Sequence, residues 1–197
     1  MASDPQEISP HAEEEIEETP GYKPPAEKSL AEIQQLDDED ESLKKYKETL
    51  LGTNLATGID DPRKVIVEKM CLVVEGRPDV ELALTGDLSV LKSSPFVIKE
   101  GTEYRIKILF RIQHEIVCGL KYHQLTYRKG IRVDKTHFMV GSYGPKAELQ
   151  FYQTPAEEAP KGMVARGHYT VKSKFIDDDK NDHLSWEWAF DIKKDWQ

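Results

Sequence analysis

Cysteine is scarce in this chain, which contains only Cys71 and Cys118 among its 197 residues. The disulfide framework of a small secreted domain uses more cysteines than this. No CxxC or HExxH spacing occurs, so the sequence supports neither a structural zinc site nor a zinc protease. Because both cysteines stand among apolar residues, we expect two buried, reduced thiols and no metal site.

Long apolar runs and an excess of positive charge are also missing. The longest apolar runs, such as residues 71–74, are far shorter than the roughly 20 residues of a membrane-spanning helix, and the first residues do not form a signal peptide. With 27 basic and 36 acidic side chains the formal net charge is −9, whereas nucleic-acid-binding proteins present a basic face. These absences predict a cytoplasmic protein that neither inserts stably into membranes nor binds nucleic acid.

Motifs of catalysis and cofactor binding are absent as well. The six histidines have neither a nucleophile elbow nor a paired carboxylate at a motif spacing, and no glycine pattern for phosphate or dinucleotide binding occurs. The acidic run 177–182 lacks the mid-loop glycine and terminal glutamate of a calcium loop, which leaves a solvated turn or a docking point for a basic segment. The sequence therefore predicts a protein without enzymatic activity or cofactor.

Charge and aromatic residues divide the chain into two parts. Residues 1–62 contain 17 acidic and 5 basic side chains and only two of the 17 aromatic residues, whereas residues 63–197 are nearly neutral. An acidic stretch with so little apolar surface does not offset the entropy of ordering. We therefore expect a flexible, partly disordered arm over 1–62 and one folded domain over 63–197, which is long enough for a hydrophobic core.

Two short helices are predicted within the arm. Ser29 opens a capping box before an apolar stripe, which predicts a helix over about 28–36. A second helix, over about 40–51, begins with acidic residues at its positive dipole end and stops before Gly52. Because each helix is too short to be stable alone, its apolar stripe packs either on the folded domain or on another protein, and the sequence leaves both open.

Beyond residue 63 the apolar residues follow a period of two. Alternation is clear over 80–85, 104–113, 169–175 and 186–193, and glycine, proline or aspartate turns separate these stretches. Eight or nine short strands with close turns are typical of an all-β, immunoglobulin-like antiparallel β-sandwich. Large aromatic residues fall on its inward positions, where they either fill the core or line a pocket between the sheets for an apolar ligand.

Several blocks of sequence, in order, resemble one known family. They include Met139-Val-Gly-Ser-Tyr-Gly-Pro145 and Asp182-His-Leu-Ser-Trp-Glu-Trp188, together with residues 22–29, 36–47, 84–88, 99–107, 157–162 and 177–180. Over about residues 22–196 the chain is similar to Rho guanine-nucleotide dissociation inhibitors. The resemblance implies a cytosolic inhibitor and chaperone that forms a 1:1 complex with prenylated Rho, Rac or Cdc42-type small GTPases. It also implies that the arm slows GDP release and that the sandwich shelters a geranylgeranyl or farnesyl group during membrane extraction.

The resemblance also assigns three groups of residues. It implies that the GTPase switch regions are contacted by Tyr22, Asp40, Ser42 and Tyr46. The implied isoprenyl pocket consists of Leu72, Phe96, Tyr104, Ile116, Val171, Trp186 and Trp188. The implied acidic surface for the GTPase and its basic tail consists of Glu157, Glu158, Asp178 and Asp179.

The sequence departs from the common family pattern at residues 75–79, 111–115 and 149–153. These differences bear on the choice of GTPase and leave the matching blocks intact. Two alternatives remain at this point: a general chaperone for prenyl or acyl lipids, and a structural β-sandwich adaptor without a ligand. Of these three hypotheses, only that of an inhibitor of Rho-type GTPases needs the arm.

Overall fold

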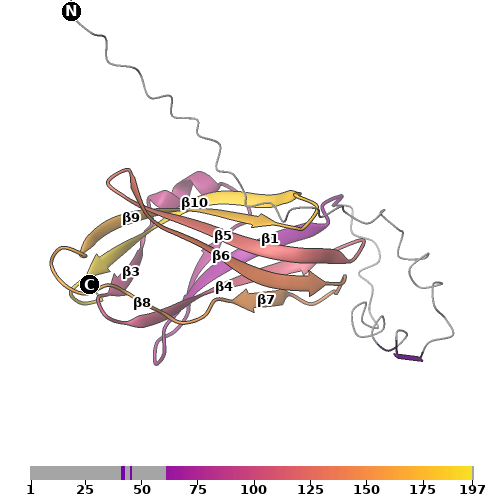
Figure 1. Ribbon diagram of the computed structural model, residues 1–197, viewed down its shortest axis with the longest axis horizontal. Coiled ribbons are helices and arrows are strands. Elements are labelled where there is room, and N and C mark those ends of the chain that lie inside the picture. The colour runs from indigo at the N-terminus through magenta and orange to yellow at the C-terminus, as the bar shows by residue number, and fades with distance from the viewer. Residues whose placement is uncertain (1–40, 43–44, 46–60, 197) are drawn as a thin grey trace, which may run out of the picture.

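The computed structural model describes residues 41–42, 45 and 61–196, and the long described segment folds into two β-sheets packed face to face (Figure 1). The strands and one short 3₁₀ helix are β1 Val65–Val73, β2 Val80–Ala83, η1 Leu88–Lys92, β3 Phe96–Lys99, β4 Glu103–Ile112, β5 Val117–Arg128, β6 Ile131–Tyr143, β7 Gln150–Gln153, β8 Glu157–Glu158, β9 Gly167–Ile176 and β10 Asp182–Lys193. The prediction of an all-β sandwich is confirmed. Within this part of the chain, no helix has the length and apolar character to span a bilayer.

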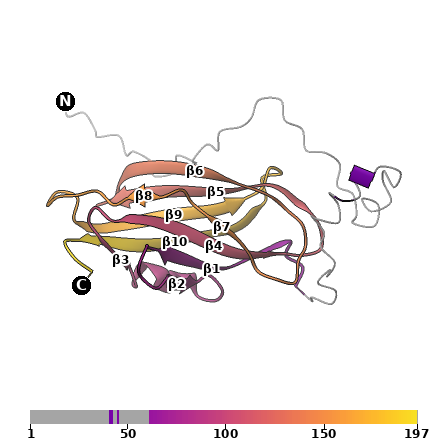
Figure 2. The same ribbon diagram turned by 90° about the horizontal axis from the view of Figure 1, so that it is seen from below.

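Each sheet contains five strands. The first sheet has the order β2-β1-β4-β7, with β8 also pairing with β4, and the second has the order β3-β10-β9-β5-β6 (Figure 2). All described pairings are antiparallel except that of β3 with β10, which is parallel. The chain therefore crosses between the sheets after β3, since β4 belongs to the first sheet.

The alternating pattern in the sequence places one face of each long strand in the core. Along β4, Ile106, Ile108, Phe110 and Ile112 are buried, while the residues between them are half-buried. The inward faces of both sheets form one hydrophobic cluster. Burial of each such large side chain contributes roughly 1.5–3 kcal/mol to stability, which makes the inter-sheet layer the main source of folding energy.

Two sequence expectations about burial are wrong. Val80 was expected to share a buried face with Leu82 and Leu84, but it is 52% exposed because it opens β2, a short strand at the edge of its sheet. Both cysteines were expected to be buried, but Cys71 is buried and Cys118 is exposed. At Cys118 the pairing of β5 with β6 shifts register and Gly119 adopts a φ of 63°. Such a β-bulge redirects a side chain, and it turns Cys118 outward.

The predicted arm helices lie mostly outside the described residues. Glu41, Ser42 and Lys45 are helical and exposed, within the range of the second predicted helix. The first predicted helix, the rest of the second and the expected disorder of the arm all fall on residues that are not described.

Candidate functional site

Five of the seven predicted pocket residues meet in one layer between the sheets. Phe96, Val171 and Trp188 come from adjacent strands of the second sheet, where Trp188 pairs with Val171 and its ring meets Phe96 edge-on at a centroid distance of 5.7 Å. Leu72 and Tyr104 come from the facing sheet, in which Leu72 pairs with Ile106. All five belong to or pack against the same hydrophobic cluster. We call this group of five residues the slot.

Of the other two predicted pocket residues, Trp186 borders the slot within the same hydrophobic cluster, whereas Ile116 lies apart from it. Trp186 is buried one step farther along β10, where it stacks on Tyr122 at 5.9 Å, and its Nε1 has no hydrogen-bond partner within the described segment. Ile116 is half-buried in the turn before β5. Val171 pairs with Thr126 on that strand, ten residues beyond Ile116. At about 3.3 Å per residue, Ile116 therefore lies toward the opposite end of the sandwich.

A buried hydrogen-bonded cluster fixes one wall of the slot. Trp188 Nε1 donates to Ser173 Oγ at 2.9 Å, and Ser173 Oγ lies 3.0 Å from Tyr122 Oη, which donates to Gln124 Oε1 at 3.1 Å. Burial raises the pKa of Tyr122 well above its usual value, so its hydroxyl stays protonated. We call Tyr122, Gln124, Ser173 and Trp188 the polar cluster. Its bonds hold the Trp188 ring in one orientation within the buried layer between the sheets.

The sequence analysis missed three members of this polar cluster. Ser173 stands between the inward-facing Val171 and Phe175 on β9, and Gln124 holds an inward position on β5. A polar residue at an inward position of a strand must find a partner inside the core. That irregularity was the available signal, but only the pairing of β5 with β9 shows that the partners are one another.

Glu157 lies at the rim of the slot. Tyr104 Oη donates to Glu157 Oε2 at 3.0 Å, across the short pairing of β4 with β8. Burial raises the pKa of Glu157, the nearby Asp134 adds to the rise, and the hydrogen bond from Tyr104 opposes it. The pKa of Tyr104 is raised as well, chiefly by its own burial and by the charge of Glu157. The pair therefore places a partly desolvated carboxylate beside an apolar layer.

The residues predicted as one acidic surface are not brought together. Glu157 and the exposed Glu158, which forms an ion pair with Lys161, lie beside the start of β4. Asp178 and the exposed Asp179 follow the far end of β9, where Asp178 forms an ion pair with Lys121 at 2.7 Å. The two acidic pairs therefore lie toward opposite ends of the sandwich.

The acidic turn after β9 is not simply solvated. Asp177 is 4% exposed and accepts hydrogen bonds from the Asn181 backbone at 2.9 Å and side chain at 3.0 Å, while its Oδ2 lies 2.8 Å from His183 Nε2. Burial acts to raise the pKa of Asp177, but the bonds to His183 and Asn181 outweigh it and lower the pKa. Asp177 thus holds the β9–β10 turn together, and only its neighbours face solvent. No cluster of three metal-ligating side chains occurs in the described segments.

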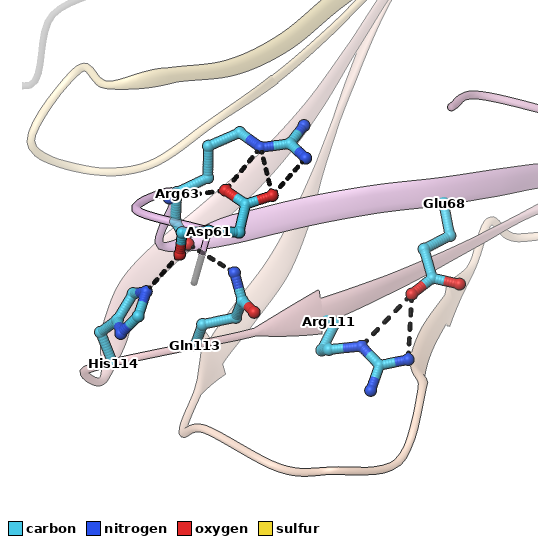
Figure 3. Close-up of polar contacts among 6 residues, drawn as sticks. All are labelled: Asp61, Arg63, Glu68, Arg111, Gln113 and His114. Carbon is cyan, nitrogen blue, oxygen red and sulfur yellow. Dashed lines mark hydrogen bonds and ion pairs between the residues drawn. The ribbon is translucent and has the colours of Figure 1, made fainter. Parts of the chain in front are cut away.

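The start of the sandwich is fastened to the turn between β4 and β5 (Figure 3). Gln113 Nε2 donates to the backbone oxygen of Arg63 at 2.8 Å, and His114 Nε2 lies 2.6 Å from the backbone oxygen of Asp61. Arg63 forms a double hydrogen bond with Asp61, and this bond holds the Asp61 pKa at about 2. Residues 111–115, a stretch that departs from the family pattern, therefore fix the point from which the preceding residues leave the sandwich.

Of the residues implied to contact GTPase switch regions, Ser42 is exposed on its helical turn. Tyr22, Asp40 and Tyr46 lie outside the described residues. The role of these four side chains therefore stays a prediction from the sequence.

Comparisons with known proteins agree with the resemblance in the sequence. The family model described as RHO protein GDP dissociation inhibitor matches residues 7–195. Human Rho GDP-dissociation inhibitor 1 is 58% identical over 93% of this chain and 91% of its own length. Human Rho GDP-dissociation inhibitor 3 is 51% identical over 97% of this chain and 86% of its own length. The putative Rho GDP-dissociation inhibitor 1 of Dictyostelium discoideum is 47% identical over 93% of this chain and 96% of its own length. A Niemann-Pick type C2 protein from Japanese carpenter ant has a TM-score of 0.40 at 12% identity, with 69% of this chain and 99% of that chain covered. That likeness is too low to bear on function.

Proposed function

Because this chain belongs to the RHO protein GDP dissociation inhibitor family, we propose that it binds prenylated Rho-class GTPases, slows their GDP release and shelters their isoprenyl group between its two sheets. It acts as a regulatory inhibitor and not as an enzyme. Rho, Rac and Cdc42-type proteins in a 1:1 complex, with a geranylgeranyl or farnesyl group as ligand, are the partners that this proposal names. The place of action is the cytoplasm.

The slot is the observation that carries the sheltering part of the proposal. Its members come from both sheets, and Leu72, Val171 and Trp188 are at most 2% exposed. An isoprenyl chain of about 20 carbons prefers an apolar site over water by on the order of ten kcal/mol, at about 0.8 kcal/mol per buried CH₂. The layer between the sheets provides such an apolar site once the sheets separate to admit the isoprenyl chain.

The arm carries the inhibitory part of the proposal. Residues that fold on a partner lose ordering entropy on binding, so their contribution to affinity is modest and reversible. A clamp on the switch regions slows nucleotide release if it favours their closed conformation. The fastening of Asp61 and Arg63 to the β4–β5 turn supports this arrangement, because it sets where the arm leaves the sandwich.

Removal of residues 1–60 separates the two activities. We expect the truncated chain to unfold cooperatively, because the core lies within the sandwich, and to bind an isoprenylated peptide. It should no longer slow GDP release from a prenylated Rho-type GTPase or extract that protein from liposomes efficiently. Nucleotide release, extraction and peptide binding are measured side by side with the full chain, and a prenylated Ras-type protein serves as the control cargo.

Inhibition that survives the truncation would contradict the proposed role of the arm. Equal extraction of the Ras-type and Rho-type proteins by the full chain would favour a general lipid chaperone instead. Failure of both chains to bind the isoprenylated peptide would contradict the slot.

A further inference from the structure

The most exposed apolar side chains of the described residues gather at one end of the sandwich. Met163 and Val164, in the loop between β8 and β9, are 82% and 86% exposed, and Ile131, at the start of β6, is 70% exposed. Figures 1 and 2 show the β8–β9 loop and the β5–β6 hairpin at the end opposite the start of β1. We call Ile131, Met163 and Val164 the apolar tip.

Hydrogen bonds hold the two loops in place beside one another. Arg128 Nη2 donates to the backbone oxygen of Arg166 at 2.7 Å, which ties the hairpin to the loop. Arg166 also forms an ion pair with Glu100 at 2.7 Å, and the Gly162 amide donates to the same carboxylate at 2.9 Å. With both of its ends bonded, the loop keeps Met163 and Val164 directed into solvent.

An excess of basic side chains lies on the hairpin part of the apolar tip, beside Ile131. Residues 128–135 contain four basic and one acidic side chain, whereas residues 157–168, around the other loop, contain two of each, in a chain whose net charge is −9. Lys129, Arg132 and Lys161 are exposed, and Lys161 also forms an ion pair with Glu158. We call these three the basic collar. The β5–β6 hairpin therefore combines a protruding apolar group with local positive charge, in contrast to the overall negative charge of the protein.

We propose that this end of the sandwich is a membrane-contact surface, which inserts the apolar tip into the interface of an anionic bilayer while the basic collar contacts lipid headgroups. Apolar side chains buried to the depth of the headgroups, together with nearby lysine and arginine, are what peripheral proteins use to bind anionic leaflets. Three side chains on two turns are far too few for a stable protein interface, which buries about 800 Å² on each partner.

The surface also lies close to the slot. Val171 is four residues from Gly167, the first residue of β9, which follows directly after the β8–β9 loop. Contact through the apolar tip therefore brings the slot to the bilayer surface. The link to isoprenyl extraction rests on the proposed function, whereas contact with lipid stands independently of it.

Vesicle binding of the full chain without any GTPase tests this surface. The probes are phosphatidylcholine vesicles with and without phosphatidylserine. We expect the chain to bind the phosphatidylserine vesicles, and I131S/M163S/V164S to bind them about tenfold more weakly. K129E/R132E should lose a similar factor. The matched controls are V80S/V90S, which removes exposed valines of β2 and η1, and R105E/K146E, which reverses one charge on β4 and one in the loop between β6 and β7; neither should change binding.

Equal binding to neutral and anionic vesicles, or unchanged binding by the triple variant, would overturn the proposal. So would a triple variant that loses affinity for a soluble, unprenylated GTPase in the absence of vesicles, because that result would make the tip a protein interface. Isoprenylated-peptide binding in solution should be the same in the triple variant and the original chain. If the original chain binds vesicles but no such peptide, the proposed function fails while the membrane-contact surface stands.

Discussion

The two ends of the sandwich are built differently. At the end nearest the start of β1, Phe110 packs against Phe175 and Tyr143 at centroid distances of 5.2 and 5.0 Å. At the other end, the slot residue Trp188 is held by a hydrogen bond to Ser173, and Glu157 closes the rim against Tyr104. At the first end the buried polar residues, Gln113 and Asp177, follow strand ends, whereas at the second end Ser173 and Gln124 hold inward positions within the strands themselves.

This difference assigns separate tasks to the two ends. Aromatic packing alone stabilises a fold and keeps the sheets closed. A buried hydrogen bond adds little net stability, whereas a buried polar group without a partner lowers stability by more than that. Such bonds do, however, define the orientation of the rings that they hold. We therefore expect substitutions at the aromatic end to act on stability, and substitutions at the slot end to act on stability and ligand binding together.

Phe110→Ala should give the largest effect. Phe110 is fully buried, and truncation of such a residue removes apolar contacts and leaves a cavity, so we expect a loss of about 3–5 kcal/mol in the free energy of unfolding. Urea denaturation followed by circular dichroism measures the loss. The molecules that remain folded should bind an isoprenylated peptide as before; a loss below about 1 kcal/mol would mean that this end is not the stabilising one.

Ser173→Ala should cost less stability but affect binding. The substitution leaves the buried Trp188 Nε1 without its acceptor, and an unpaired buried donor costs about 1–3 kcal/mol. Since the Trp188 ring is then less firmly oriented, affinity for an isoprenylated peptide should fall severalfold. Thr170→Ala, on the other face of β9, is the matched control and should change neither quantity. Normal peptide affinity in a destabilised Ser173→Ala variant would separate the polar cluster from ligand binding.

Glu157→Gln should have the smallest effect on the free energy of unfolding, below about 1 kcal/mol. The size of this effect depends on pH. The raised pKa of Glu157 means that the folded protein binds its proton more tightly than the unfolded chain does. The contribution of Glu157 to the free energy of unfolding therefore falls as the pH rises above 4.5, the ordinary pKa of a glutamate side chain. Glutamine still accepts the bond from Tyr104 without becoming charged. The variant should be as stable as the original chain below pH 4.5 and more stable than it at pH 7. Midpoints of urea denaturation across that range measure this difference. A variant that is less stable at pH 7 would contradict the burial of the Glu157 carboxylate.

Strand patterning was the most predictable feature of this protein. The alternation along β4 and β10 appears directly in the sequence, because side chains of a strand point to opposite faces in turn. Local irregularities were not predictable in the same way. The bulge that exposes Cys118 depends on how β5 pairs with β6, and the exposure of Val80 depends on which strand forms the edge of its sheet.

The candidate site was predictable in its residue types more than in its arrangement. Trp188, Val171 and Phe96 were expected to share a pocket, and they meet in the slot. Ile116 was expected there too, but the structure places it at the far end of β5. The segment 111–115 attracted notice only as a departure from a family pattern, while the structure shows that Gln113 and His114 fasten residues 61–63.

The sequence by itself determined the class of fold, the acidic character of the first 62 residues and the family, because periodicity, charge and ordered motifs are properties of neighbouring residues. Only the tertiary structure decided that Ser173 supports Trp188, that Glu157 meets Tyr104, and that the β5–β6 hairpin lies beside the β8–β9 loop. These relations join residues that are far apart in the chain, and strand order and register, which long-range packing sets, bring them together.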